Sequence, residues 1–126
     1  MKNLKDIIQE KLIINKDSKL RDPEDMSQWQ VGDILAGTYG YSMTLPRFYE
    51  IIKRTDKSFT VVRRSGKIVS GHRNGQWEEV VDDSKRDKDL KNPPIIGRIR
   101  KWGGLKIDDV LVHLWNGKPL WGDDMD

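Results

Sequence analysis

The chain has 126 residues, enough for one small domain with a modest core. Charged residues make up 34% of it and hydrophobic residues 36%, which is too polar for a membrane protein and too apolar for a wholly disordered chain. Because cysteine is absent, disulfides, thiolate zinc sites and thiol nucleophiles are excluded. We expect neither a membrane span nor a secretory signal.

The N-terminal segment predicts a short helix over residues 3–14 with one apolar face, formed by Leu4, Ile7, Ile8 and Leu12. A helix of this length is marginal on its own, so this face must be buried. We interpret residues 1–14 as an amphipathic docking helix that packs on a second copy of the chain or on a phage or host protein; the alternative is that it caps the chain's own barrel. Residues 15–28, rich in charge and containing Pro23, predict a linker.

From residue 29 onward the pattern changes to short alternating segments. Strands are predicted at residues 30–36, 48–54, 58–64, 67–70, 76–81, 95–102, 110–115 and 119–121. Hairpin turns are predicted at 55–57, Asn74-Gly75 and Asn116-Gly117. Together with the N-terminal amphipathic helix, this array favours a mainly β domain over residues 29–121, built as a small SH3-like barrel of five to seven short antiparallel strands.

The apolar members of these strands predict the core. We expect it to contain Val31, Ile34, Phe48, Ile51 or Ile52, Phe59, Val61 or Val62, Ile96, Val110, Val112 and Leu114, with Trp77 and Trp115. Residues 82–92 are dense in charge and predict a solvated loop. Residues 122–126 predict an acidic tail.

Two segments carry the excess of positive charge. Eight basic side chains lie between Arg47 and Arg73, against only Glu50 and Asp56, and residues 91–106 contain five basic and no acidic ones. We expect one basic face, able to attract phosphate or an acidic partner; the alternative is a solvated strand face. The expected face consists of Arg47, Arg63, Arg64, Arg73, Arg98, Arg100 and Lys101. Neighbouring aromatic side chains are suited to stacking on bases.

One further binding element is predicted, and no catalytic one. The segment 37–46 is rich in glycine and aromatic residues, so Tyr39, Tyr41 and Met43 form a candidate binding loop. His72 and His113 are the only histidines, and neither lies in a catalytic motif. Adjacent acidic residues on a strand point to opposite faces and do not readily chelate one ion. We therefore expect a non-enzymatic chain without a cofactor or a metal site.

Residues 31–64 and 114–121 carry a recognisable set of motifs. These are Gly32-Asp33, Tyr39-Gly40-Tyr41, Thr44, Phe48-Tyr49 and the run from Leu114 to Pro119. The pattern resembles a family of small uncharacterised proteins of bacteriophages and mobile elements, in which the last motif is Leu-Trp-Asp-Gly-Lys-Pro; here Asn116 replaces its aspartate. The resemblance implies a phage-encoded accessory protein in the host cytoplasm or the virion, and it assigns no chemistry.

Two functions are consistent with these observations. The first is a protein-interaction module, either a virion component or a host-directed factor, that docks through its N-terminal helix. The alternative is a nucleic-acid-binding module that uses the basic segments 47–73 and 91–106 with their neighbouring aromatic residues. No membrane partner is expected.

Overall fold

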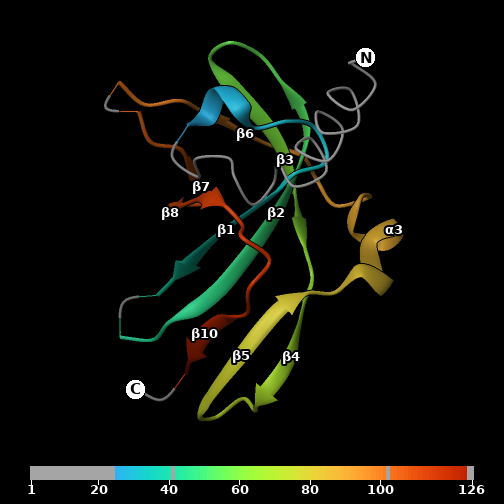
Figure 1. The fold of residues 1–126 in the computed structure, drawn as a ribbon, viewed down its shortest axis with the longest axis vertical. Coiled ribbons are helices and arrows are strands. Elements are labelled where there is room, and N and C mark those ends of the chain that lie inside the picture. Colours follow the sequence, from blue (N-terminus) through green and yellow to red (C-terminus); the bar gives the residue numbers. More distant parts are fainter. Residues whose placement is uncertain (1–24, 41, 102, 125–126) are drawn as a thin grey trace, which may run out of the picture.

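The computed structural model describes residues 25–40, 42–101 and 103–124, and the predicted docking helix lies outside them. The described chain is mainly β and forms three antiparallel sheets (Figure 1), which confirms the expected class. The strands are β1 (Ile34–Tyr39), β2 (Leu45–Arg54), β3 (Ser58–Arg64), β4 (Gly66–Gly71), β5 (Gln76–Val81), β6 (Ile95–Arg98), β7 (Lys106–Ile107), β8 (Val110–Leu111), β9 (His113–Leu114) and β10 (Leu120–Asp123). The helical turns are η1 (Met26–Gln28), η2 (Asp83–Lys85) and α3 (Arg86–Asp89).

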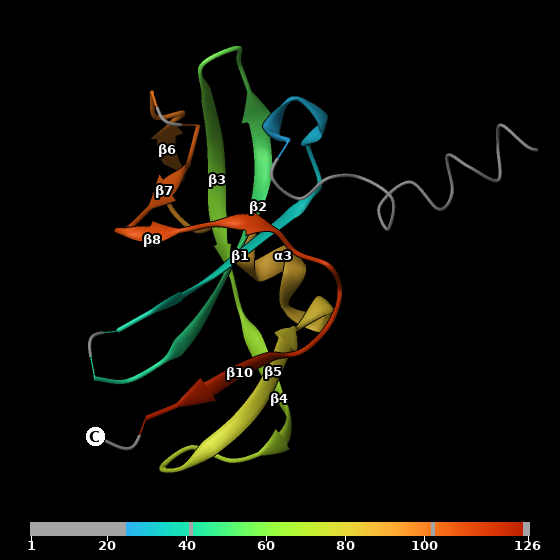
Figure 2. The same cartoon turned by 60° about the vertical axis from the view of Figure 1, so that its left-hand side comes forward.

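The largest sheet has the order β6-β3-β2-β1-β9, with the β2–β3 hairpin at its centre. After β3 the chain leaves this sheet at Ser65 and enters a three-stranded sheet of order β10-β5-β4. The β7–β8 hairpin pairs only with itself and crosses the face of the large sheet (Figure 2). The strands of the described residues therefore bend over one another without closing into one hydrogen-bonded barrel.

The main core lies between the large sheet and the β7–β8 hairpin. Alternate residues of the central strands point into it, and the segment from Leu105 to Val112 covers them. Its buried members are Trp29, Leu35, Tyr49, Ile51, Phe59, Val61, Leu105, Ile107, Val110, Val112 and Leu114. A smaller cluster of Ala36, Phe48 and Val81 fills the other face of the sheet, where the three-stranded sheet approaches.

Most of the predicted core is confirmed, but two members are wrong. Val31 is 60% exposed because it lies in the turn before β1, and Ile96 is 68% exposed because it points outward from the edge strand β6. Ile34 and Trp115 are only partly buried, against the smaller cluster.

The structure also differs from the sequence interpretation at the boundaries of the domain. Met26, assigned to the linker, lies in η1 and packs against the main core, while Asp25 caps that turn. At the other end, β10 extends into the predicted tail. The turns at 55–57 and Asn74-Gly75 join hairpins as predicted, but Asn116-Gly117 does not, because β9 pairs with β1 and β10 with β5.

The charged segment 82–92 is not a simple solvated loop, because Asp89 is only 2% exposed. Its carboxylate accepts hydrogen bonds from the Ser65 backbone N–H at 2.6 Å, the Ser65 hydroxyl at 2.7 Å and Arg64 Nε at 3.3 Å. Arg64 also donates to Glu50 at 2.6 Å, and Arg86 donates to the same carboxylate at 2.8 Å. We call Glu50, Arg64, Asp89 and Arg86 the buried charge network; the first three are at most 3% exposed.

This network fastens α3 to the central hairpin. Glu50 lies on β2, Arg64 on β3 and Asp89 on α3. The bond from Arg64 to Glu50 therefore joins β3 to β2, and the bond from Arg64 to Asp89 joins β3 to α3. Burying a charge costs desolvation free energy, and a fold tolerates this only when the charge is paired and hydrogen-bonded. Arg64 meets both conditions. Sequence pattern alone misses the segment because its buried groups are polar.

Replacing one member of the network leaves the others unpaired. We expect Asp89→Ala to lower the free energy of unfolding by about 3 kcal/mol, because it leaves the buried donors of Arg64 and Ser65 without an acceptor. Asp87→Ala, an exposed aspartate of the same helix, is the control and should change it by less than about 0.5 kcal/mol. Urea denaturation of both variants measures the difference; equal stabilities would contradict the role of the network.

The same carboxylate makes stability depend on pH. Burial raises the pKa of Asp89, but the hydrogen bonds from Ser65 and Arg64 together hold it below its ordinary value of 3.8. A folded-state pKa below the unfolded one adds stability above the unfolded pKa, and this stability is lost as pH falls through the folded pKa. We expect the wild-type midpoint in urea to fall below pH 4 more steeply than that of Asp89→Asn.

Candidate anion-binding cleft

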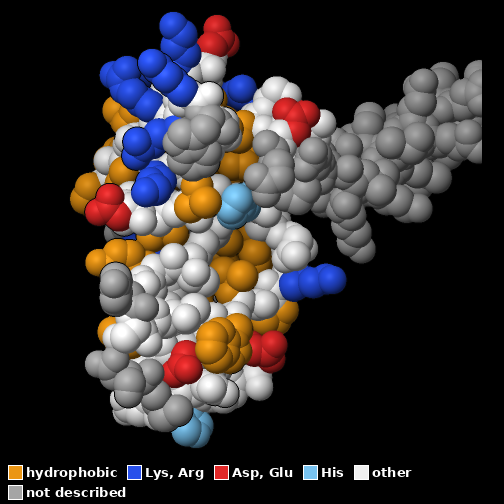
Figure 3. Space-filling model, turned by 90° about the vertical axis from the view of Figure 1, so that its left-hand side faces the viewer, with side chains coloured by type: hydrophobic (Ala, Val, Ile, Leu, Met, Phe, Trp, Pro, Cys, Tyr) orange, Lys and Arg blue, Asp and Glu red, His pale blue; other side chains and the backbone are white. Residues whose placement is uncertain are grey.

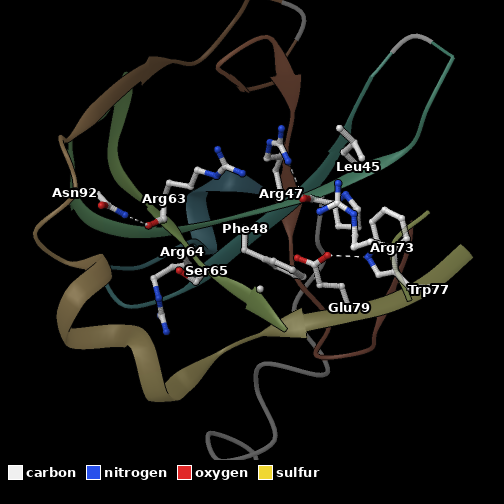
Figure 4. Close-up of a pocket in the computed structure, with 12 residues that line it drawn as sticks. Leu45, Arg47, Phe48, Arg63, Arg64, Ser65, Arg73, Trp77, Glu79 and Asn92 are labelled. Atoms are coloured by element: carbon white, nitrogen blue, oxygen red, sulfur yellow. Dashed lines mark hydrogen bonds between the residues drawn. The ribbon is translucent and has the colours of Figure 1, made fainter. Parts of the chain in front are cut away.

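A cleft of about 400 Å³ opens where β3 passes into β4, between the large and the three-stranded sheet (Figure 4). Its wall comes from the start of β2, the end of β3, the β4–β5 hairpin and the segment after α3. The lining residues are Leu45, Pro46, Arg47, Phe48, Arg63, Arg64, Ser65, Gly66, Arg73, Trp77, Glu79 and Asn92. Four of them are arginines and one is a glutamate, so the lining carries an excess of positive charge.

Arg47 and Arg63 share one face of the β2–β3 hairpin. Arg63 is the register partner of Tyr49, two residues along β2 from Arg47. Burial lowers the pKa of the Arg47 guanidinium, and the positive charge of Arg63 lowers it further. Neither arginine forms an ion pair with a carboxylate of the described residues. The hairpin thus holds two like charges near each other with no ion pair to either, and the more distant Glu79 carboxylate raises the pKa of Arg47 by a smaller effect.

Arg47 is nevertheless held in place. Its guanidinium lies over the Tyr39 ring at 5.3 Å from the centroid, and Nη1 donates to the Pro46 carbonyl at 3.4 Å. Below the two arginines, Tyr49 is fully buried, and burial followed by the nearby Asp108 carboxylate raises the pKa of its phenol. The two arginines therefore lie next to a buried side chain that carries no charge.

The opposite wall is built around Trp77. Arg73 lies over its ring at 4.9 Å from the centroid and pairs with Asp124 at 2.9 Å, while Gly122 of β10 packs directly against the ring. Trp77 is therefore only 3% exposed. Trp77 therefore packs within this wall, and Arg73 is the exposed side chain on it.

Glu79 brings a negative charge into this basic cleft. Its Oε1 accepts from Trp77 Nε1 at 2.8 Å, and Figure 4 shows the carboxylate facing the centre of the cleft. Gly66 leaves room for it, because a Cβ at that position would lie 1.8 Å from Glu79 Oε2. Within the described chain, no arginine forms an ion pair with Glu79.

The predicted basic face divides into separate regions. Arg47, Arg63 and Arg73 meet at the cleft, whereas the guanidinium of Arg64 turns away from it (Figure 4) into the buried charge network. Arg64 is therefore a structural residue and no part of an exposed face.

The remaining members of the face lie at the far end of β3. Arg98 pairs with Ser58, five residues or roughly 17 Å along β3 from Arg63. By strand alternation the two arginines also point to opposite faces of the sheet. Arg100 and Lys101 follow in an exposed turn at this end, where Lys and Arg side chains gather in Figure 3. We call Arg98, Arg100 and Lys101 the distal basic patch.

The candidate binding loop lies at the end of the β1–β2 hairpin. Tyr39 is 46% exposed and Met43 is 36% exposed, and both line a shallow pocket with Asp109. Tyr41 lies outside the described residues, as do Leu4, Ile7, Ile8 and Leu12. Tyr39 touches both sites because its ring supports Arg47.

Sequence reasoning missed Glu79 and Asn92 as cleft residues. The Asn74-Gly75 hairpin signal, extended by strand alternation, places Glu79 on the same face as Trp77. No local signal identifies Asn92, whose Nδ2 donates to the Arg63 carbonyl at 2.8 Å from the segment that follows α3.

Metal sites and membrane spans are two other classes of feature that bear on function. The described residues contain no group of three or more potential metal-binding side chains of His, Asp or Glu. In the same part of the chain, no helix has the length and apolar character needed to cross a bilayer. His72 is exposed at the β4–β5 turn, with Nδ1 near the Arg73 carbonyl at 3.3 Å, and His113 is partly buried in β9.

Comparison with known proteins gives no information on the function of the cleft. No protein-family model, curated protein or solved structure matches this chain.

The support of the cleft wall can be tested at Gly122. A Cβ there would lie 2.5 Å from the Trp77 ring, which is too rigid and too buried to yield, so we expect Gly122→Ala to cost about 1–3 kcal/mol of unfolding free energy. Gly75→Ala is the control, since its Cβ would meet only the His72 carbonyl at 3.6 Å. Thermal denaturation compares them; a Gly122→Ala variant as stable as Gly75→Ala would show that the ring is not held against β10.

Proposed function

We propose that the chain is a nucleic-acid-binding module whose cleft holds a phosphate of the strand between Arg47 and Arg63. The observation that carries the proposal is the pair itself: half-buried Arg47 and exposed Arg63 share one face of the hairpin, and neither forms an ion pair with a carboxylate of the described residues. A phosphate would supply the missing counter-charge and accept several of their hydrogen bonds.

Arg47 and Arg63 lack an ion pair with any described carboxylate. Two like charges held close repel each other, most strongly where burial reduces solvent screening. Arg64 shows how the same fold treats a guanidinium that serves stability, because it surrounds that group with Glu50 and Asp89. Arg47 and Arg63 receive no such partner from the described chain, which favours an anion from outside it.

The distal basic patch supports the proposal in a different way. Arg98, Arg100 and Lys101 are exposed and lie at the far end of β3 from Arg63, so they do not contact the same phosphate. Exposed positive charge of this kind raises the rate of encounter with a polyanion and adds binding that is independent of sequence.

The double variant Arg47→Gln/Arg63→Gln tests the proposal. We expect its affinity for a fluorescein-labelled single-stranded oligonucleotide to fall at least tenfold. The slope of log K against log salt should decrease by about 1.4, because each arginine that no longer contacts the phosphate of a single strand removes about 0.7 unit. Fluorescence anisotropy across a salt series measures both quantities.

The control removes the same charge elsewhere. Lys85→Gln/Lys88→Gln changes two exposed lysines of η2 and α3 and should leave affinity within about twofold. Binding that shows no salt dependence, or that the arginine variant and the lysine variant weaken equally, would contradict a phosphate site in the cleft.

A protein-interaction module of phage origin is the second candidate. It is favoured by the exposure of Tyr39 and Met43 at the tip of the β1–β2 hairpin, together with the sequence resemblance. If this function holds, Met43→Ser abolishes association with a protein partner and leaves oligonucleotide affinity unchanged. We also propose an SH3-like barrel for the fold, supported by the short antiparallel strands and by the β7–β8 hairpin that crosses the face of the large sheet (Figure 2).

A further inference from the structure

Glu79 is the least expected group in the cleft. A carboxylate opposes phosphate binding, and it would ordinarily pair with one of the arginines that line the same space. Instead Oε1 accepts a hydrogen bond from Trp77, no described residue donates to Oε2, and the carboxylate acts on Arg47 only through its charge, without an ion pair. The fold therefore keeps an acceptor oxygen near two arginines without joining them in an ion pair.

Such a cleft fits a ligand that has an anionic group and hydrogen-bond donors at a fixed separation. A nucleotide has both, since its phosphate is the anion and its base edge carries N–H groups. The volume of about 400 Å³ is in the range of pockets that hold molecules of this size. Among the bases, guanine presents two adjacent donors, N1–H and the N2 amino group, which suit one carboxylate.

We propose that the cleft selects guanine in single-stranded nucleic acid, with Glu79 accepting from the guanine edge while Arg47 and Arg63 hold the adjoining phosphate. This inference rests on the proposed function, because it assigns a base preference to the same site. The strand is single because N1–H is free only in an unpaired base.

Glu79 is held for this role from two sides. Trp77 fixes Oε1, and Gly66 supplies the space that the rest of the carboxylate occupies. Gly66 has an ordinary backbone conformation, so an alanine there is not strained; its methyl group would instead displace the Glu79 carboxylate. The position thus offers a way to move the acceptor without removing it.

The test compares Glu79→Gln with the wild-type chain. An oligothymidylate with one central guanine should bind the wild type about tenfold more tightly than the same strand with thymine, adenine or cytosine there, since one hydrogen bond to a charged group accounts for that ratio. In the variant, the one amide oxygen is engaged by Trp77 and an NH₂ group faces the guanine donors. We expect the preference for guanine to disappear in anisotropy titrations, while binding to oligothymidylate is retained.

Two further variants make the result specific. Glu78→Gln alters the neighbouring exposed glutamate, which points to the opposite face of β5, and should keep the guanine preference. Gly66→Ala, whose methyl group displaces the Glu79 carboxylate, should lose the preference and still bind oligothymidylate.

The outcomes separate the two proposals. If all four oligonucleotides bind alike, with steep salt dependence and sensitivity to Arg47→Gln/Arg63→Gln, the guanine inference is wrong and the phosphate site stands. If the arginine variant binds every strand as the wild type does, both are wrong. A guanine preference that survives Glu79→Gln also overturns the inference.

Discussion

The position of Arg64 is the constraint on which the rest of the structure depends. This guanidinium lies between the sheet and α3, and it is stable there only because Glu50 and Asp89 accept from it. The same bonds fasten the charged segment after β5 to the central hairpin. That segment supplies Asn92, which donates to the backbone of Arg63. The buried charge network and the cleft therefore meet where the end of β3 contacts α3 and the segment that follows it.

Strand alternation places two adjacent arginines in different surroundings at this junction. Arg63 and Arg64 are adjacent on β3, so one points to each face of the sheet. Arg64 enters an enclosed space with acidic partners, and Arg63 joins Arg47 in a cleft where the described chain offers neither of them an ion pair. The contrast between a guanidinium with ion pairs and one without is the physical basis for assigning a structural role to Arg64 and ligand binding to Arg63.

The sequence predicts well what local rules decide. The β2–β3 and β4–β5 hairpins follow from alternation and turn chemistry, and most apolar strand residues are buried as expected. Prediction from the sequence fails where distant segments meet: Asn116-Gly117 joins strands of different sheets, and Ile96 faces outward because β6 is an edge strand.

For the site, the sequence identifies the arginine-rich segments but not which arginines form ion pairs, since Asp89 reaches Arg64 from 25 residues away. Glu79 cannot be recognised as a cleft residue until the two sheets are placed.

The account depends most directly on Arg47 and Arg63 being the groups that meet the ligand. Side-chain Nε–Hε signals of arginine, followed by NMR during titration with a single-stranded oligonucleotide, report on each guanidinium separately. The account predicts saturable shifts for Arg47 and Arg63 and an unchanged signal for Arg64, which the buried network retains. Shifts confined to Arg98 and Arg100, with Arg47 and Arg63 unmoved at saturation, would contradict it.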